Sequence, residues 1–294
     1  MILGCDVSKW QGVMKWNITK ESGARFGLIR AGSINNITGV CYTDYQYPNN
    51  VTAAPEHMPV GYYWYFRGNK DANKQADYLS SLLRDYRSPA IFADVEEQAG
   101  LTPEALRDSV AKFIGRIHAN LGVWAGIYTR ATVWNLYSYG DPPKRGGVAE
   151  SALWPRLKLW VARYGVNQPW VYGSKYKVRD WNNWNIWQFS ADGNGLGRKF
   201  GADSGSIDLN YFNGDEKNLA EFFGGSVDQE PSEYNPVTVI AGSGLNIRAK
   251  ADQAASKLGS AVYGSTWDVV GRKPGMDGAV WYKVAGWVSG DWVK

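Results

Sequence analysis

The segment Ala90-Ile91-Phe92-Ala93-Asp94-Val95-Glu96-Glu97 is a short apolar run that ends in carboxylates. Pro89 precedes the run and Gly100 follows it, which is typical of a buried strand bounded by turn residues. Alternate residues of a strand face the same side, so Asp94 and Glu96 are predicted to share a face, with Cα atoms roughly 6.5–7 Å apart. Carboxyl groups at that spacing suit acid-assisted cleavage of a glycosidic bond. Two solvated acids at a strand end are the alternative.

Seven other segments have a similar apolar character, which makes eight predicted strands. In order these are Leu3–Val7, Phe26–Ala31, Val60–Phe66, Ala90–Val95, Val123–Tyr128, Leu157–Arg163, Asn185–Phe189 and Ser206–Tyr211. Helical stretches separate most of the early ones, and this alternation indicates a parallel sheet that is covered on its outside. Eight such strands predict an α/β fold of the TIM-like β/α barrel type. Loops rich in Trp, Asn and Gly replace helices between Val161 and Ile207, so the barrel is predicted to be irregular there.

Two long helices and three short ones are predicted between these strands. The first long helix, over residues 72–86, has one apolar stripe at helical spacing, formed by Ala72, Ala76, Leu79, Leu83 and Tyr86. The second begins at Thr102, an N-cap followed by Pro103, and ends at Gly122. The short helices are predicted over Asn17–Gly23, Asn50–His57 and Ala131–Ser138.

Four acids fall at predicted strand ends. Asp6 ends the first strand, Asp94 and Glu96 end the fourth, and Asp208 lies on the last. The first and eighth strands of a closed barrel are neighbours, so Asp6 and Asp208 are predicted to lie side by side at the same rim. A cluster of like charges raises the pKa of at least one member, which keeps that carboxyl group protonated near neutral pH. Four converging acids therefore favour chemistry over chance solvation.

The composition is that of a globular protein of 294 residues, 44% hydrophobic and 20% charged, which allows one large domain and one small domain. The chain has 15 Trp and 18 Tyr but only 9 Phe, and such amphipathic rings suit sugar surfaces as well as a core. The net charge of +4 includes no Lys/Arg-rich block, so nucleic-acid binding is not expected. No run reaches the length of a membrane span and no signal peptide is recognised, so membrane insertion is not expected.

Metal, cofactor and thiol chemistry are not expected. Cys5 and Cys41 have no metal-ligand spacing, and we expect Cys5 to be a buried reduced thiol, with a single bridge to Cys41 left open. With only His57 and His118 as histidines, a zinc site or a Ser-His-Asp triad is not predicted.

A change of composition marks a second domain. Residues 226–236 carry three acids and two prolines with almost no apolar content, which is typical of a solvated linker. Residues 237–294 contain short strand candidates separated by glycine turns, which predict a small all-β barrel. Their net charge of +3 makes up most of the positive excess of the chain. A mild positive charge would help association with an anionic surface such as a cell wall.

A series of motifs runs through residues 1–225 in a fixed order. They are Gly4-Cys5-Asp6-Val7-Ser8-Lys9-Trp10-Gln11-Gly12, Ile29-Arg30-Ala31, Gly61-Tyr62-Tyr63, Asp94-Val95-Glu96, Gly126-Ile127-Tyr128-Thr129, Leu159-Trp160-Val161-Ala162, Trp187-Gln188-Phe189 and Ile207-Asp208-Leu209-Asn210. Their order and spacing resemble the family 25 glycoside hydrolases, the Chalaropsis-type lysozymes. Residues 237–294 resemble a bacterial SH3-like cell-wall-binding module through Leu245-Asn246-Ile247-Arg248, Trp281-Tyr282-Lys283-Val284 and Gly286-Trp287-Val288.

The first resemblance implies a muramidase that hydrolyses the β-1,4 bond between N-acetylmuramic acid and N-acetylglucosamine in peptidoglycan, with net retention. Glu96 would be the general acid, and Asp94 would stabilise charge at the anomeric centre directly or through the 2-acetamido group of the substrate. Asp6 and Asp208 would shape the charge of the site and hold Glu96 and sugar hydroxyls in place. The resemblance also implies substrate binding by Tyr63, Tyr128, Trp160 and Gln188, with core packing as the alternative for the aromatic residues.

One motif departs from the family pattern. Where the family often has Tyr-His-Phe, this chain has Tyr63-Trp64-Tyr65, which we interpret as a change in packing or in a sugar contact.

The expected setting is a phage endolysin that stays in the host cytoplasm until it reaches a Gram-positive-type wall, and that acts as a monomer. The alternatives are a bacterial autolysin, a catalytically inactive wall-binding protein, and a glycosidase that acts on chitin-like chains.

Overall fold

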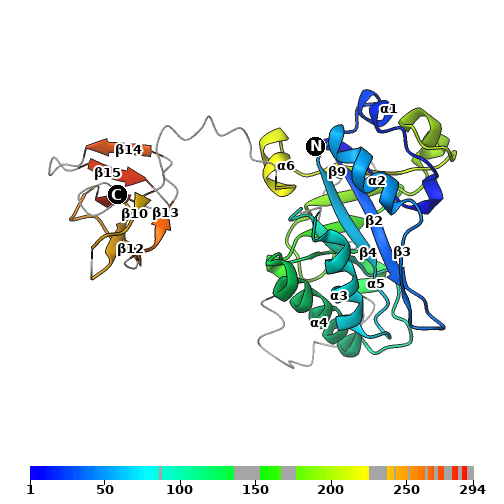
Figure 1. Cartoon of the computed structure of the whole chain (residues 1–294), viewed down its shortest axis with the longest axis horizontal. Coiled ribbons are helices and arrows are strands. Elements are labelled where there is room, and N and C mark those ends of the chain that lie inside the picture. Colours follow the sequence, from blue (N-terminus) through cyan, green and yellow to red (C-terminus); the bar gives the residue numbers. More distant parts are fainter. Residues whose placement is uncertain are drawn as a thin grey trace. The chain divides into compact units, whose positions relative to one another are not determined.

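The computed structural model describes residues 1–85, 88–135, 153–166, 177–224, 237–241, 243–250, 252–261, 264–267, 271–274, 280–283 and 287–289. The chain divides into two compact units, Met1–Gly225 and Ser226–Lys294 (Figure 1).

The first unit is a mixed α/β barrel of eight strands. They are β1 (Ile2–Val7), β2 (Gly27–Ile34), β4 (Val60–Tyr65), β5 (Ile91–Asp94), β6 (Gly126–Thr129), β7 (Leu159–Ala162), β8 (Ile186–Ser190) and β9 (Asp208–Phe212). They follow one another in the order β1-β9-β8-β7-β6-β5-β4-β2, and a parallel pairing of β1 with β2 closes the barrel. The eight predicted strands are therefore all present, with bounds that differ by a few residues. A ninth strand, β3 (Cys41–Thr43), was not predicted and pairs antiparallel with the end of β2.

The prediction of a parallel sheet is wrong for the last strand. β9 runs antiparallel to both of its neighbours, β8 and β1. The connection from β8 to β9 contains only two short 3-10 helices, η5 (Gly193–Gly195) and η6 (Gly197–Phe200), so no crossover helix returns the chain to the far end of the barrel. β9 therefore enters from the carboxyl end of the parallel strands. We call this end the mouth.

The inside of the barrel changes from apolar to polar along its axis. The part away from the mouth is a cluster of buried side chains that includes Phe26, Phe92, Ile186 and Phe212. Glycines at inward-facing positions make room for these rings: a Cβ at Gly126 would lie 2.7 Å from the ring of Phe92. Nearer the mouth, the inward-facing positions of the strands carry acids and amides instead. The apolar core thus ends where the acids begin.

Helices cover the outside of the barrel (Figure 1). They are α1 (Trp16–Glu21), α2 (Tyr47–Ala53), α3 (Ala72–Leu83), α4 (Pro103–Leu121), α5 (Ala131–Trp134) and α6 (Glu216–Phe222). The side chain of Thr102 caps α4 by accepting from Ala105 N–H, and Gly122 ends it with a φ of 72° in the left-handed region. The apolar stripe predicted for α3 is buried as far as Leu83, and Tyr86 lies outside the described residues. Phe222 and Phe223, at the end of α6, pack on Phe92 and Phe26 and close the other end of the barrel.

The second unit consists of short antiparallel strands. They are β10 (Val237–Thr238), β11 (Leu245–Arg248), β12 (Lys257–Ala261), β13 (Thr266–Trp267), β14 (Gly271–Pro274), β15 (Val280–Lys283) and β16 (Trp287–Ser289). Five of them form a sheet in the order β12-β11-β16-β15-β14, and β10 pairs with β13. Buried Val239, Ile247 and Ala261 supply a small core.

Both cysteines are buried and free. Among the described residues, no helix is long and apolar enough to cross a membrane.

Candidate active site

The mouth of the barrel carries two acids in direct opposition. Asp6 near the end of β1 is paired in register with Asp208 at the start of β9, as the neighbourhood of the first and last strands predicted. Asp208 opens its strand rather than ending it, because β9 is antiparallel. Burial raises the pKa of Asp208, and the charge of Asp6 and a hydrogen bond between the two carboxyl groups raise it further. The pair therefore retains a proton near neutral pH.

Asp94 and Glu96 form a second pair. Asp94 is the last residue of β5 and is buried, whereas Glu96 lies two residues beyond the strand and is half-buried. Burial raises the pKa of Asp94 well above its ordinary range, and the charge of Glu96 and a hydrogen bond to it act in the same direction. The two carboxyl groups are therefore in contact, much closer than their Cα spacing alone required. Asp94 Oδ1 is buried and has no hydrogen-bond partner among the described residues.

Two amides connect Asp6 to the aromatic residues of the barrel. Asn210 Nδ2 and Gln188 Nε2 both donate to Asp6 Oδ2, each at 2.8 Å. These hydrogen bonds act against the effect of burial, which raises the pKa of Asp6 to about 6. Gln188 Oε1 accepts from the hydroxyls of Tyr128 at 2.7 Å and Tyr164 at 2.6 Å. Gln188 is thus bonded on both sides within the protein.

The three aromatic residues predicted to bind substrate pack against one another. Tyr63 and Tyr128 have their ring centroids 5.5 Å and 4.3 Å from that of Trp160. Trp160 is 1% exposed, and its indole N–H donates to Asn210 Oδ1 at 2.8 Å. Trp160 therefore lies in the floor beneath the acids, where it can support Tyr63, Tyr128 and Asn210 but has no open face. Tyr63 and Tyr128 are each 7% exposed.

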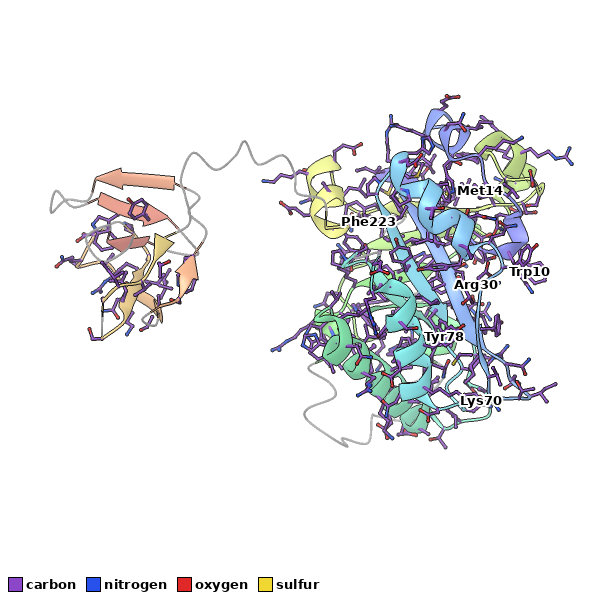
Figure 2. All side chains as sticks on the ribbon, in the orientation of Figure 1. Trp10, Met14, Arg30, Lys70, Tyr78 and Phe223 are labelled. Atoms are coloured by element: carbon purple, nitrogen blue, oxygen red, sulfur yellow. The ribbon has the colours of Figure 1, made fainter. Side chains whose placement is uncertain are left out.

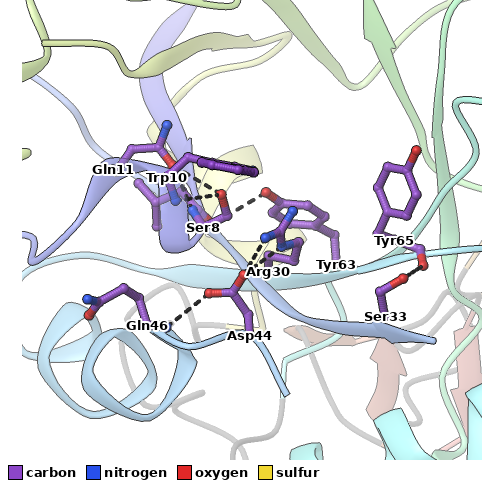
Figure 3. Close-up of polar contacts among 10 residues, drawn as sticks. Ser8, Trp10, Gln11, Arg30, Ser33, Asp44, Gln46, Tyr63 and Tyr65 are labelled. Atoms are coloured by element: carbon purple, nitrogen blue, oxygen red, sulfur yellow. Dashed lines mark hydrogen bonds and ion pairs between the residues drawn. The ribbon is translucent and has the colours of Figure 1, made fainter. Parts of the chain in front are cut away.

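A buried ion pair flanks the mouth. Arg30 on β2 bonds Asp44 Oδ2 through two nitrogens, at 2.7 Å and 2.5 Å, and Asp44 Oδ1 accepts from Gln46 N–H. Figure 3 shows this pair beside the ring of Tyr63. The positive charge of Arg30 acts on Asp94, where it opposes the rise in pKa. Arg30 therefore partly offsets the negative charge around Asp94.

An exposed tryptophan also lies close to this end of the barrel. Ser8 caps η1 (Lys9–Gln11), directly after β1, and this turn presents Trp10 with 68% of its surface exposed. In Figure 2 Trp10 lies on the opposite side of the first unit from Phe223, which closes the far end.

Sequence reasoning assigned no role to Tyr164, Asn210, Arg30 or Asp44. Arg30 and Asn210 lie within the ordered motifs of residues 1–225, and strand alternation places Asn210 on the same face as Asp208. Asp44 and Tyr164 follow strand ends in loops, where no periodicity marks them.

The Tyr63-Trp64-Tyr65 departure is a packing change. Trp64 is fully buried on the outer face of β4, and its indole N–H donates to Gln75 of α3 at 3.0 Å.

No cluster of three or more metal-ligating side chains occurs in the described part of the chain.

Comparison with known proteins identifies relatives of the first unit. The model of the glycosyl hydrolases family 25 matches residues 5–198, a range that ends before Asp208. Lysozyme M1 of Streptomyces globisporus is 30% identical over 230 residues, which cover 74% of this chain and 70% of that protein. The autolytic lysozyme of Clostridium acetobutylicum is 27% identical over 168 residues, or 56% of this chain and 46% of that protein.

Solved structures give the same fold. The lysozyme of Streptomyces coelicolor superposes with a TM-score of 0.60 at 27% identity and covers 76% of this chain and 96% of its own. The muramidase of Acremonium alcalophilum superposes with a TM-score of 0.57 at 20% identity, covering 76% of this chain and 98% of its own, and shows likeness of fold.

Proposed function

Since the chain belongs to family 25 of the glycosyl hydrolases, we propose that it is a lysozyme of the muramidase type, which hydrolyses the β-1,4 bond between N-acetylmuramic acid and N-acetylglucosamine in peptidoglycan. The observation that carries the proposal is the hydrogen-bonded Asp94–Glu96 pair beside the proton-sharing Asp6–Asp208 pair. Burying acids of like charge costs free energy, and a protein that only binds walls would gain nothing from that cost.

Glu96 is the proton donor in this proposal. It is the more exposed member of the Asp94–Glu96 pair, so it is the one that can reach the glycosidic oxygen. The proton that the pair shares moves to Glu96 and from there to the leaving oxygen as the glycosidic bond breaks. Asp94 is left ionised at that moment, when positive charge develops at the anomeric carbon.

Asp94 stabilises that charge, either directly or by orienting the 2-acetamido group of the substrate. The contact between the two carboxyl groups leaves no room between them for the water molecule of an inverting enzyme, in which the groups are ~6.5–9.5 Å apart. This favours net retention.

The remaining polar groups hold the substrate and the acids in place. Asp6 and Asp208 set the charge of the mouth, and Tyr63, Tyr128 and Gln188 form its wall. Trp160 contributes by packing beneath these residues.

Clearing of purified peptidoglycan by the Glu96→Gln variant tests the acid assignment. We expect loss of activity with an unchanged melting temperature, because the amide keeps the shape of the side chain but cannot donate a carboxyl proton. Glu97→Gln is the matched control: Glu97 is the next residue and forms an ion pair with Arg67, so its variant should clear walls normally. Undiminished clearing by Glu96→Gln would refute the proposal.

The bond specificity has its own test. Borohydride reduction of the released fragments converts the new reducing sugar to its alditol. Muramitol identifies cleavage after N-acetylmuramic acid, whereas glucosaminitol would identify a glucosaminidase instead. Chitin oligosaccharides offered in parallel test the chitin-like alternative.

The second unit is proposed to be an SH3-like module that binds Gram-positive-type walls. Support comes from its small antiparallel sheet and from the net positive charge of residues 237–294. Intact walls should sediment the Glu96→Gln chain, and a chain that ends at Gly225 should stay in the supernatant to a greater extent. Equal sedimentation of the two would refute a targeting role.

The biological setting is proposed to be a phage endolysin that acts as a monomer and waits in the host cytoplasm. An autolysin is the second candidate, and one relative is an autolytic lysozyme. An endolysin made in the cytoplasm of its host lyses the cell only after the membrane is permeabilised. Lysis of the cell without permeabilisation would favour an autolysin that is exported.

A further inference from the structure

The side-chain amide of Gln188 lies at the centre of the polar network in the mouth. Its oxygen accepts two hydroxyl groups, Tyr128 Oη at 2.7 Å and Tyr164 Oη at 2.6 Å. Its nitrogen donates to Asp6 Oδ2 at 2.8 Å and lies 3.4 Å from Asp208 Oδ2. All the hydrogen-bonding capacity of this amide is therefore directed at protein groups.

We infer that Tyr164 is a positioning residue of this site: with Tyr128 it fixes the orientation of the Gln188 amide, and the amide in turn keeps Asp6 the ionised member of the Asp6–Asp208 pair. The activity readouts below rest on the proposed function. The orientation of the amide and the state of the pair do not.

An unambiguous donor sets the reference for the network. An indole N–H can only donate, so the Trp160 bond makes Oδ1 the inward oxygen of Asn210 and turns Nδ2 of Asn210 toward Asp6. Asp6 Oδ2 is therefore an acceptor. A reversed Gln188 amide would set its oxygen against this acceptor, and the contact would be relieved only if Asp6 took up a proton. The orientation of Gln188 and the protonation of Asp6 are consequently linked.

The two tyrosines decide that orientation. A carbonyl oxygen has two lone pairs, and Tyr128 and Tyr164 fill both. Burial raises the pKa of each hydroxyl, so both stay protonated and remain donors throughout the pH range of activity. Tyr128 comes from β6 and is 7% exposed, whereas Tyr164 follows β7 and is 39% exposed. Tyr164 thus closes the network on the solvent side.

Other charged and titratable groups act on the Asp6–Asp208 pair from the surrounding elements. They are Cys5 on β1, Tyr63 on β4, Asp94 and Glu96 at the end of β5, Tyr128 on β6, Tyr164 after β7 and Asp192 after β8. The acids among them favour protonation of the pair. Hydrogen bonds from Asn210, Gln188 and Asp208 oppose protonation at Asp6 by lowering its pKa.

Variants of the two tyrosines test the inference through the pH dependence of wall clearing. Without the Tyr164 hydroxyl the Gln188 amide is held less firmly as a donor to Asp6, and loss of that donor raises the pKa of Asp6. The acidic limb of the profile should therefore move to higher pH in Tyr164→Phe. The shift should reach about one pH unit in the double variant Tyr128→Phe/Tyr164→Phe. Tyr211→Phe is the control, because Tyr211 lies on the outer face of β9, stacked on Phe189. Its profile should match that of the wild type.

A double-mutant cycle separates positioning from contact with sugar. Gln188→Met has a side chain of similar length and no amide, so adding Tyr164→Phe to it should change nothing further if Tyr164 acts through Gln188. A uniform loss of rate at every pH that adds in full to the loss in Gln188→Met would overturn the inference and make Tyr164 a substrate ligand. An unchanged profile in both tyrosine variants would overturn it as well.

Titration of the carboxyl groups gives a readout without substrate. Carbon-13 NMR of aspartate-labelled full-length protein should show the lower apparent pKa of the pair moving upward in Tyr128→Phe/Tyr164→Phe. The resonances of the pair are assigned by their change in Asp208→Asn. A static titration refutes the inference, whatever the activity. Absence of wall clearing in the wild type would instead refute the proposed function and leave the titration result to stand.

Discussion

Asp6 on β1 lies directly opposite Asp208 on β9, in the register of two antiparallel strands. The fold therefore brings two carboxyl groups that are far apart in the sequence of the first unit into hydrogen-bond contact. Like charges at this distance cannot both be ionised without a large cost in free energy, so the pair retains a proton. The cost of this arrangement can be measured.

Asp208→Asn should make the protein more stable at neutral pH than the wild type. The folded-state pKa of Asp208 is raised above its unfolded value, so the folded state binds more protons and wild-type stability falls as pH rises above about 4. Asparagine removes that dependence. Melting temperatures near pH 5 and about pH 8 should show a larger advantage for the variant at the higher pH. An advantage that is the same at both pH values would contradict this account, and wall clearing should be reduced at each.

Arg30→Met should be strongly destabilising. Asp44 is 1% exposed, and removing its partner leaves a buried charge uncompensated, at a cost of about 3–5 kcal/mol in the free energy of unfolding. Urea denaturation measures the loss. Arg116→Met is the control, because Arg116 and Asp77 form an ion pair with both side chains about half exposed, and its stability should stay close to the wild type. Similar losses in both variants would show that burial of the pair is not the cause.

Lys158→Met should change how stability varies at alkaline pH. Lys158 Nζ donates to the carbonyls of Pro89 and Phe222 at the closed end of the barrel, and burial lowers its pKa to about 8. Between pH 8 and the ordinary lysine pKa of about 10.4, the unfolded state binds more protons, so wild-type stability rises with pH. Thermal melting at intervals over this range should show that rise in the wild type and in Lys217→Met. A rise of the same size in Lys158→Met would contradict the assignment.

Gly126→Ala should disrupt the barrel wall. A Cβ at this position would lie 2.6 Å from the carbonyl oxygen of Lys158 and 2.7 Å from the Phe92 ring, so the backbone just before β7 would have to move. Overpacking of this kind typically costs ~1–3 kcal/mol. Gly115→Ala is the matched control, because Gly115 lies inside α4 and a Cβ added there would meet no neighbouring atom within 4 Å. Alanine at this position should therefore stabilise the protein by ~0.5–1 kcal/mol. The two variants should therefore change chemical denaturation in opposite directions.

Local patterning gave much of the barrel. Apolar runs located its eight strands, and the Thr102 cap and Gly122 located the ends of α4, because strand burial and helix capping depend on neighbouring residues. The direction of β9 was not predicted, although the absence of a helix before Ile207, from which that direction follows, was. The β3 strand was also missed, because three residues carry too short a pattern.

The sequence by itself determined which residue types could do the chemistry: Asp6, Asp94, Glu96 and Asp208 lie at strand ends in an order that allowed the barrel mouth to be predicted. Only the tertiary structure decided their states. Burial, the contact between Asp94 and Glu96, and the hydrogen bond that Gln188 Nε2 donates to Asp6 set where protons reside. A pKa depends on dielectric surroundings and on partners distant in the chain, and strand periodicity carries no information about either.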